Sequence, residues 1–178
     1  MSPWTVGTGR LLLSPVGWGD LAELVALKGD PLVYAQMLGG VRGPALVVQE
    51  LAEDTAFWSR HGVGMWLVRA RSGGAPVGLV GLHERGDGRG LALRFAFIPA
   101  SRGQGLAREA AGAALRFAHD EAGLARVVAV ARESNIGSRT VLGAIGMREC
   151  DTFLRGGEAM LVYESTREST RPPRSAGA

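Results

Sequence analysis

Apolar residues recur along this chain with two different periods, and each period predicts a different kind of element. An apolar strand is predicted at residues 10–14, where the following proline ends it. Spacings of three and four residues then predict helices at residues 20–27, 31–37 and 44–61. The buried side of the longest of these helices is expected to consist of Leu46, Leu51, Phe57 and Trp58.

Beyond residue 62 the period shortens to two, which is typical of strands. Apolar runs at residues 65–71, 76–84 and 91–98 are separated by glycine-rich turns, so they predict an antiparallel meander. The third run alternates most clearly, because Leu91, Leu93, Phe95 and Phe97 fall on one face. The opposite face consists of Ala92, Arg94, Ala96 and Ile98.

The helical period returns after Pro99. One stripe of the predicted helix consists of Leu106, Ala110, Ala113, Ala114 and Phe117, and the polar face consists of Arg108, Arg116, His119 and Asp120. We expect His119 to lie at the surface. The small residues of the stripe would let this helix lie close to a sheet.

A strand at 126–131, a helix at 135–145 and two closing strands at 147–153 and 158–164 complete the pattern. This order predicts an α+β fold, with one mixed sheet in a single domain of residues 8–164. The polar segment 165–178 is predicted to be a disordered tail.

Composition agrees with one globular domain, since 46% of the 178 residues are hydrophobic and 21% are charged. No apolar run approaches the roughly 18 residues that span a bilayer, and the start of the chain does not resemble a signal peptide. We therefore expect a cytoplasmic protein without a membrane partner. One cysteine and three scattered histidines predict neither an internal disulfide nor a metal site.

The pI of about 9.7 raises the question of a nucleic-acid partner. Most of the net charge of +3, however, falls in the predicted tail, where three arginines stand against one glutamate. Nucleic acid is therefore not expected to be the primary partner.

The segment Arg102–Ala107 has the pattern R-x-x-G-x-A and joins a predicted strand to a predicted helix. Free backbone amides at the start of a helix attract anions, and glycine lets a phosphate approach the main chain. Arg102 could add a charged contact. The segment Arg85–Gly90 has a similar pattern but precedes no helix, so it is interpreted as a hairpin turn. The alternative for Arg102–Ala107 is an ordinary glycine-rich turn.

The run Phe97–Ala110 resembles the signature segment of the GNAT superfamily of N-acetyltransferases. Asn135–Ser138 with Gly143–Met147 resembles the next conserved block of that superfamily. Thr8–Leu13, together with Phe57 and Trp58, resembles the Rim-type branch, which acetylates the N-termini of ribosomal proteins. The resemblance covers about residues 8 to 164.

This resemblance implies a GNAT-like fold, in which a mixed, mostly antiparallel and splayed central sheet is flanked by helices. It implies acetyl-CoA as co-substrate, with the pantetheine arm in the gap of the sheet and the pyrophosphate on the amides of residues 104–108. For Asn135, contact with the cofactor arm competes with a role as helix N-cap. The implied cofactor-binding residues are Phe97, Ile98, Arg102, Gly103, Gln104, Gly105, Leu106, Ala107, Arg108 and Asn135.

The resemblance also implies direct attack of an amine on the thioester, without a covalent acyl-enzyme. Many relatives carry a glutamate base and a tyrosine acid, but the matching positions here hold Ala92 and Leu142. The remaining candidates are Ser138 as the acid and His83 as the base. Each has a structural alternative, since Ser138 could satisfy backbone groups and His83 could belong to a solvated strand end.

The acceptor is expected to be a protein N-terminus, by analogy with the Rim-type branch, or else a small amine. The main alternative function is a coenzyme A-binding module whose catalysis is lost or altered. A nucleic-acid-binding protein ranks third. The sequence does not decide between a monomer and a homodimer.

Overall fold

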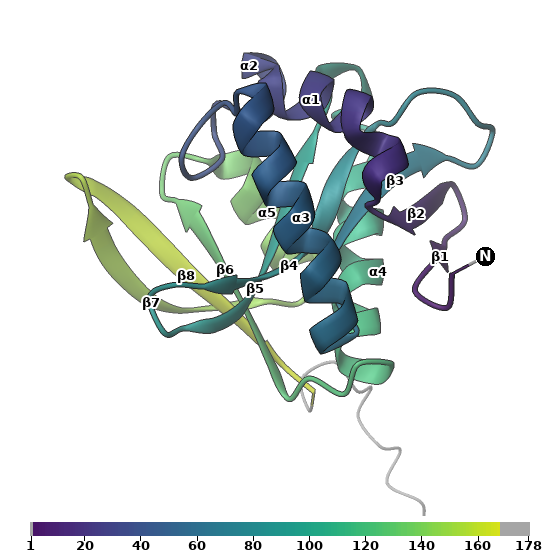
Figure 1. Cartoon of the computed structure of the whole chain (residues 1–178). Coiled ribbons are helices and arrows are strands. Elements are labelled where there is room, and N and C mark those ends of the chain that lie inside the picture. The colour runs from purple at the N-terminus through teal and green to yellow at the C-terminus, as the bar shows by residue number, and fades with distance from the viewer. Residues whose placement is uncertain (1, 168–178) are drawn as a thin grey trace, which may run out of the picture.

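Within residues 2–167, which the computed structural model describes, eight strands form one sheet in the order β1-β2-β3-β4-β5-β6-β8-β7 (Figure 1). The strands are β1 (Val6–Gly7), β2 (Leu11–Pro15), β3 (Met65–Ala70), β4 (Gly78–Arg85), β5 (Gly90–Phe97), β6 (Arg126–Arg132), β7 (Arg148–Arg155) and β8 (Glu158–Thr166). Only β5 and β6 pair in parallel, and all other neighbours are antiparallel. The predicted α+β class and the mixed, mostly antiparallel sheet are therefore confirmed.

Helices cover both faces of this sheet (Figure 1). One face carries α1 (Leu21–Gly29), α2 (Pro31–Tyr34) and α3 (Pro44–His61), and the other carries α4 (Leu106–Asp120) and α5 (Ile136–Ala144). Short 3-10 turns at Trp18–Asp20 and Pro99–Ser101 lead into α1 and toward α4. The core is split in the same way, with one apolar cluster on each side of the sheet.

The boundaries of α3 follow from its sequence. Proline occupies the start of the helix, and Gly62 ends it with φ of 63°, a left-handed conformation that glycine adopts easily. Near the start of α3 the predicted buried stripe is wrong by one residue. Val47 is buried, whereas Leu46, which was predicted to be buried, is 42% exposed. Val47 lies four residues before Leu51, so both face the sheet on the same side of the helix.

Helix α4 packs against the sheet through alanines, as predicted from its small stripe. The expectation that His119 lies at the surface is wrong, because its ring is completely buried. Its Nδ1 donates to the carbonyl oxygen of Leu124 at 2.7 Å, and in the neutral ring Nε2 accepts from Ser165 Oγ at 3.0 Å. The turn after α4 and the end of β8 thus cover a residue that helical periodicity alone placed outside.

The sheet opens at its only parallel junction. Strands β5 and β6 pair at the single position Ala92–Val128. Strand β6 remains paired with β8 along its whole length, from Arg126 to Arg132. Beyond Ala92 the two strands therefore separate, which confirms the splayed sheet.

Other differences from the sequence predictions are local. Helix α2 ends at Tyr34 instead of residue 37, and the two-residue strand β1 was too short to predict. Strand β8 continues to Thr166, so Ser165 and Thr166 belong to the sheet and not to the predicted tail. Residues 168–178 of that tail lie outside the described part of the chain.

Candidate active site

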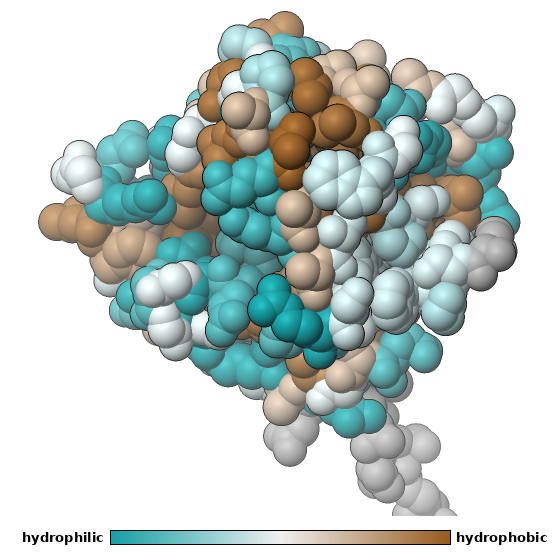
Figure 2. Space-filling view, viewed as in Figure 1, coloured by the Kyte–Doolittle hydropathy of each residue, from teal (hydrophilic) through white to brown (hydrophobic). Residues whose placement is uncertain are grey.

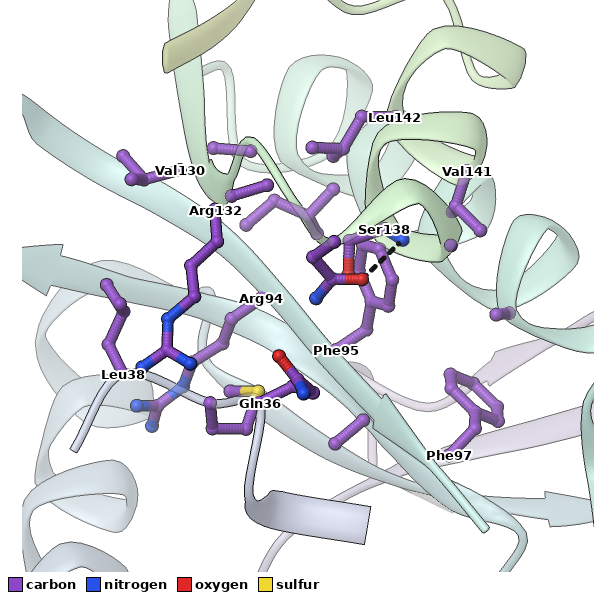
Figure 3. A pocket seen from close by; sticks show the side chains of 18 of the residues that line it. Gln36, Leu38, Arg94, Phe95, Phe97, Val130, Arg132, Ser138, Val141 and Leu142 are labelled. Carbon is purple, nitrogen blue, oxygen red and sulfur yellow. Dashed lines mark hydrogen bonds between the residues drawn. The ribbon is translucent and has the colours of Figure 1, made fainter. Parts of the chain in front are cut away.

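The separation of β5 and β6 creates a cavity of about 630 Å³. Its walls come from both strands, the start of α4, helix α5, and α2 with the segment that follows it (Figure 3). Alternate residues of β5 point to opposite faces of the sheet, so Phe95 and Phe97 line it on the α4 side and Arg94 lines it on the α3 side. The cavity therefore passes through the plane of the sheet.

At one end of the cavity, the turn Arg102–Ala107 leads into α4. Gly103 and Gly105 have φ of 72° and 75°, so both need the left-handed conformation, and Gly105 is the N-cap. Within residues 2–167, the backbone N–H groups of residues 103–108 have no hydrogen-bond acceptor. A run of free amides at a helix start is an anion-binding site.

Side chains hold this turn through hydrogen bonds to carbonyl groups in the turn and outside it. Arg10 Nη1 donates to the carbonyl oxygen of Gln104 at 2.8 Å, and Gln104 Nε2 donates to that of Ala100 at 2.8 Å. Arg102 Nε donates to the carbonyl oxygen of Phe97 at 3.2 Å, and its Nη2 also donates to Leu32. The guanidinium of Arg102 is thus engaged with main-chain oxygens and ties α2 to the end of β5.

Glu109, in the first turn of α4, links the turn to the N-terminal strands. It accepts hydrogen bonds from Thr8 Oγ1 at 2.5 Å, from the Arg10 amide at 2.9 Å and from Arg10 Nε at 2.7 Å. Burial raises the pKa of Glu109, but the hydrogen bonds from Thr8 and Arg10 outweigh it and lower the pKa overall. This link was not predicted from the sequence, although Thr8 and Arg10 lie in the segment Thr8–Leu13, on which part of the family resemblance rests.

The main chain of β5 offers free groups to the gap. Ile98 does not contribute, since its N–H donates to Val77 and its carbonyl accepts from Ser101. Main-chain groups of alternate residues point to opposite sides of a strand, so those of Phe95 and Phe97 point away from β4 and toward the gap. Strand β6 pairs with neither, and only the Phe97 carbonyl has a partner there, in Arg102. Phe95 was not among the predicted cofactor-binding residues, although it lies two residues before Phe97 and therefore points to the same side of the strand.

Helix α5 brings Asn135 and Ser138 to the cavity wall. Asn135 is the N-cap, and its Oδ1 accepts from the Ser138 amide at 3.1 Å, drawn as the dashed line in Figure 3. The Ser138 hydroxyl has no hydrogen-bond partner within residues 2–167. The amide of Ser138 is therefore satisfied by the cap, while its hydroxyl is free in the cavity.

His83 lines the cavity on the α3 side, next to Ala92. Its Nδ1 donates to the carbonyl oxygen of Ala92 at 3.0 Å, which leaves Nε2 as an acceptor. Burial, reinforced by the charge of Arg94, lowers the pKa of His83 to about 3. Ala92 and Leu142, at the positions that the resemblance matches to a glutamate and a tyrosine in many relatives, also line the cavity and are buried.

Two arginines complete the α3 side. Arg94 of β5 and Arg132 of β6 extend toward Gln36 and Leu38 of the segment after α2 (Figure 3). Among residues 2–167, no three His, Cys, Asp or Glu side chains gather as metal ligands would. In the same range, no helix has the length and apolar content needed to cross a bilayer.

Comparison with known proteins identifies the domain. The family described as Acetyltransferase (GNAT) domain matches residues 10–148. An acetyltransferase from Agrobacterium tumefaciens superposes with a TM-score of 0.79 at 24% identity, covering 93% of this chain and 95% of that one. Among curated proteins, none is significantly similar.

Two further structures share the fold at low identity. The ribosomal α-N-protein acetyltransferase RimL, in complex with coenzyme A, has a TM-score of 0.73 at 12% identity, covering 91% of this chain and 97% of that one. A spermidine N-acetyltransferase chimera from Vibrio cholerae and hSSAT has a TM-score of 0.72 at 16% identity, covering 91% and 98%. These neighbours acetylate different acceptors, so the fold alone does not select one.

The lowered pKa of His83 predicts that its ring stays neutral in the folded protein down to about pH 4. The unfolded chain binds this proton near pH 6.5, so the contribution of His83 to stability is complete above pH 6.5 and is lost as the pH falls toward 3. An NMR titration of the imidazole signals, assigned with His83→Gln, measures the midpoint. A midpoint above about pH 5 would contradict the neutral ring inferred for the partly buried His83.

Proposed function

Because the chain belongs to the GNAT acetyltransferase family, we propose that it transfers the acetyl group of acetyl-CoA to the nitrogen of a primary amine. The observation that carries this proposal is the row of free amides at residues 103–108, at the mouth of a cavity that passes through the sheet. An anionic cofactor on one side and an acceptor on the other could then meet inside the gap.

The residues on the α4 side fit coenzyme A. The amides of residues 103–108 would hold the pyrophosphate, because the turn exposes them while its carbonyls are engaged. The free main-chain groups of Phe95 and the free N–H of Phe97 would bind the amide groups of the pantetheine arm. Arg102 acts by fixing the turn, and Asn135 by capping α5. Acetyl-CoA supplies the thioester that the amine attacks.

The residues inside the gap would manage the protons. The attacking amine must be neutral, whereas an α-amino group has a pKa near 8 and is mostly protonated at neutral pH. His83 presents an unprotonated Nε2 that can accept a hydrogen bond from the amine or from a water next to it. The free hydroxyl of Ser138 can donate a proton to the departing sulfur. The new bond is N–C, and the bond that breaks is C–S. The proton that the amine nitrogen loses would pass to the water next to His83, and Ser138 would regain its proton from solvent.

A protein or peptide N-terminus is the first acceptor to test, by likeness to the Rim-type branch, and a small amine is the second. The alternative of a coenzyme A-binding module without catalysis has one specific support. Ala92 and Leu142 stand in the cavity where many relatives carry the base and the acid. Turnover separates the two functions.

The proposed function predicts that coenzyme A raises the unfolding temperature and that acetyl-CoA is consumed with some amines. At 100 times its Kd, a ligand adds about 2.7 kcal/mol to the free energy of unfolding. A thermal-shift titration followed by a thiol-release assay across peptides and small amines measures both. Stabilisation without turnover of any amine would favour a coenzyme A-binding module. The absence of any stabilisation would contradict both acetyl transfer and coenzyme A binding.

The anion-binding turn predicts that Gly105→Ala weakens coenzyme A binding by about tenfold, because alanine distorts a left-handed N-cap that sets the amide directions. Gly88→Ala is the matched control. Gly88 has φ of 74°, close to the 75° of Gly105, but it lies in the hairpin turn Arg85–Gly90. Both variants should lose about 1 kcal/mol of stability, as expected for alanine in the left-handed region. Calorimetric titration that gives equal affinities for the two variants would refute the role of the turn.

The free hydroxyl of Ser138 predicts that Ser138→Ala lowers kcat about tenfold or more while the KM for acetyl-CoA changes little. The capping bond to Asn135 survives, since it uses the backbone amide. Ser134→Ala, in the exposed segment before α5, controls for nearby substitution. Steady-state kinetics in which both variants keep the original kcat would remove Ser138 from the mechanism.

A further inference from the structure

The side of the cavity that faces α3 has a distinct chemistry. Ala96 of β5 belongs to the α3-side core and Ala129 of β6 to the α4-side core, so Arg94 and Arg132 both face α3 by alternation. The two arginines come from the two strands that flank the gap, and both extend toward the segment after α2 (Figure 3). They lie on the opposite face of the sheet from the turn before α4, and thus on the acceptor side in the proposed function.

Of the residues within 2–167 that line this cavity, none is an aspartate or a glutamate, whereas four are arginines. Two of the four donate hydrogen bonds through Nε and Nη2: Arg102 to carbonyl groups, and Arg85 to Asp87, with Nε at 2.9 and 3.1 Å from its two oxygens. In Arg94 and Arg132, by contrast, neither terminal nitrogen makes a hydrogen bond within residues 2–167. On the face shown in Figure 2, hydrophilic side chains prevail between α3 and the hairpin of β7 and β8.

Arg132 is the more weakly paired of the two. Its Nε lies 3.2 Å from Glu158 Oε2, but it is buried and makes no hydrogen bond within residues 2–167. Glu158 itself is 57% exposed, so solvent screens this pair. The two terminal nitrogens of Arg132 are free to form the bidentate contact that guanidinium groups make with carboxylates.

Arg94 interacts only weakly with residues of β3 and α3. Its Nε contacts Met65 Sδ at 3.3 Å, and its Nη2 lies 3.7 Å from Asp54 Oδ1, beyond hydrogen-bond range. Asp54 is also shared with Lys28, whose Nζ lies 3.8 Å away. The charge of Arg94 is therefore incompletely neutralised where the residue lines the cavity.

We propose that the acceptor carries a carboxylate a few bonds from its amine, and that Arg132 and Arg94 bind this carboxylate. The proposal rests on acetyl transfer to an amine and names the class of amine. The carboxylate can be the α-carboxylate of a free amino acid or an acidic side chain at the start of a peptide. A polyamine is excluded, because its second ammonium group would meet guanidinium groups and no acid.

The decisive experiment compares acceptors in pairs that differ only in charge. One pair is a free amino acid and its amide, and the other is a short peptide with Asp or with Asn next to the N-terminus, with spermidine as a cationic reference. In the unmodified protein, the acid member of at least one pair should have a kcat/KM about tenfold or more above its amide, as expected for a charge-assisted bidentate contact. The pair that responds identifies the source of the carboxylate.

Substitution then assigns the preference to the arginines. Arg132→Gln should lower kcat/KM for the acid about tenfold, leave the amide within about twofold and keep the KM for acetyl-CoA. Arg94→Gln should act in the same direction. Arg60→Gln, on the exposed side of α3, removes the same charge outside the cavity and should change neither acceptor.

Four results would overturn the proposal in distinguishable ways. Equal rates for acid and amide, or spermidine as a good acceptor, would refute the acceptor class while acetyl transfer stands. An acid preference that survives both Arg132→Gln and Arg94→Gln would refute the role of these arginines. Failure to acetylate any amine would refute the proposed function and this inference with it.

Discussion

A strand inside a sheet gives up its hydrogen bonds on one side only where other groups can take them, because an unpaired buried amide or carbonyl is costly. Strand β5 does this after Ala92, the last position at which it pairs with β6. The opening is maintained because each half of the sheet is complete without it. Strands β3 to β5 form a meander to which β2 adds an antiparallel strand, and β6 is fully paired with β8. The cavity, the two chemically distinct sides and the exposed main chain of Phe95 all depend on this one separation.

The turn Arg102–Ala107 follows the same principle on a smaller scale. Arg10 donates to the carbonyl oxygen of Gln104, and the side chains of Arg102 and Gln104 donate to the carbonyl oxygens of Phe97 and Ala100 just before the turn, so the chain direction is fixed while the amides stay free. Arg10 is in turn held by Glu109, the carboxylate in the first turn of α4, where a negative charge is favourable. The local sequence of the turn leaves its amides unpaired, but their direction is set by Arg10, which lies about a hundred positions away in the sequence. Preorganisation of this kind reduces the ordering cost when an anion binds.

Most of the fold could be predicted, because the spacing of apolar residues distinguishes helices from strands and because proline and glycine mark where elements begin and end. Pro44 and Gly62 fix the limits of α3, and the pairing of the meander follows from its turns. The misplaced residues share a cause, since each depends on tertiary packing. His119 is buried by Ser165 from a distant strand, and the side chain of Arg102 is engaged by the carbonyls of Leu32 and Phe97. A sequence pattern shows which groups a turn exposes, but not which distant groups reach them.

The arginines on the α3 side of the cavity bear on the alanine at position 92, where the resemblance implies a glutamate base in many relatives. Neighbouring positive charge and burial disfavour a protonated nitrogen, and they hold His83 in its neutral form. A bound ammonium group in the same place would experience the same effects, so its pKa would fall and more of it would be neutral and nucleophilic. A carboxylate elsewhere on the acceptor would supply the attraction that offsets this repulsion. The environment could thus perform part of the task that a glutamate performs in relatives, which makes an alanine at position 92 compatible with acetyl transfer.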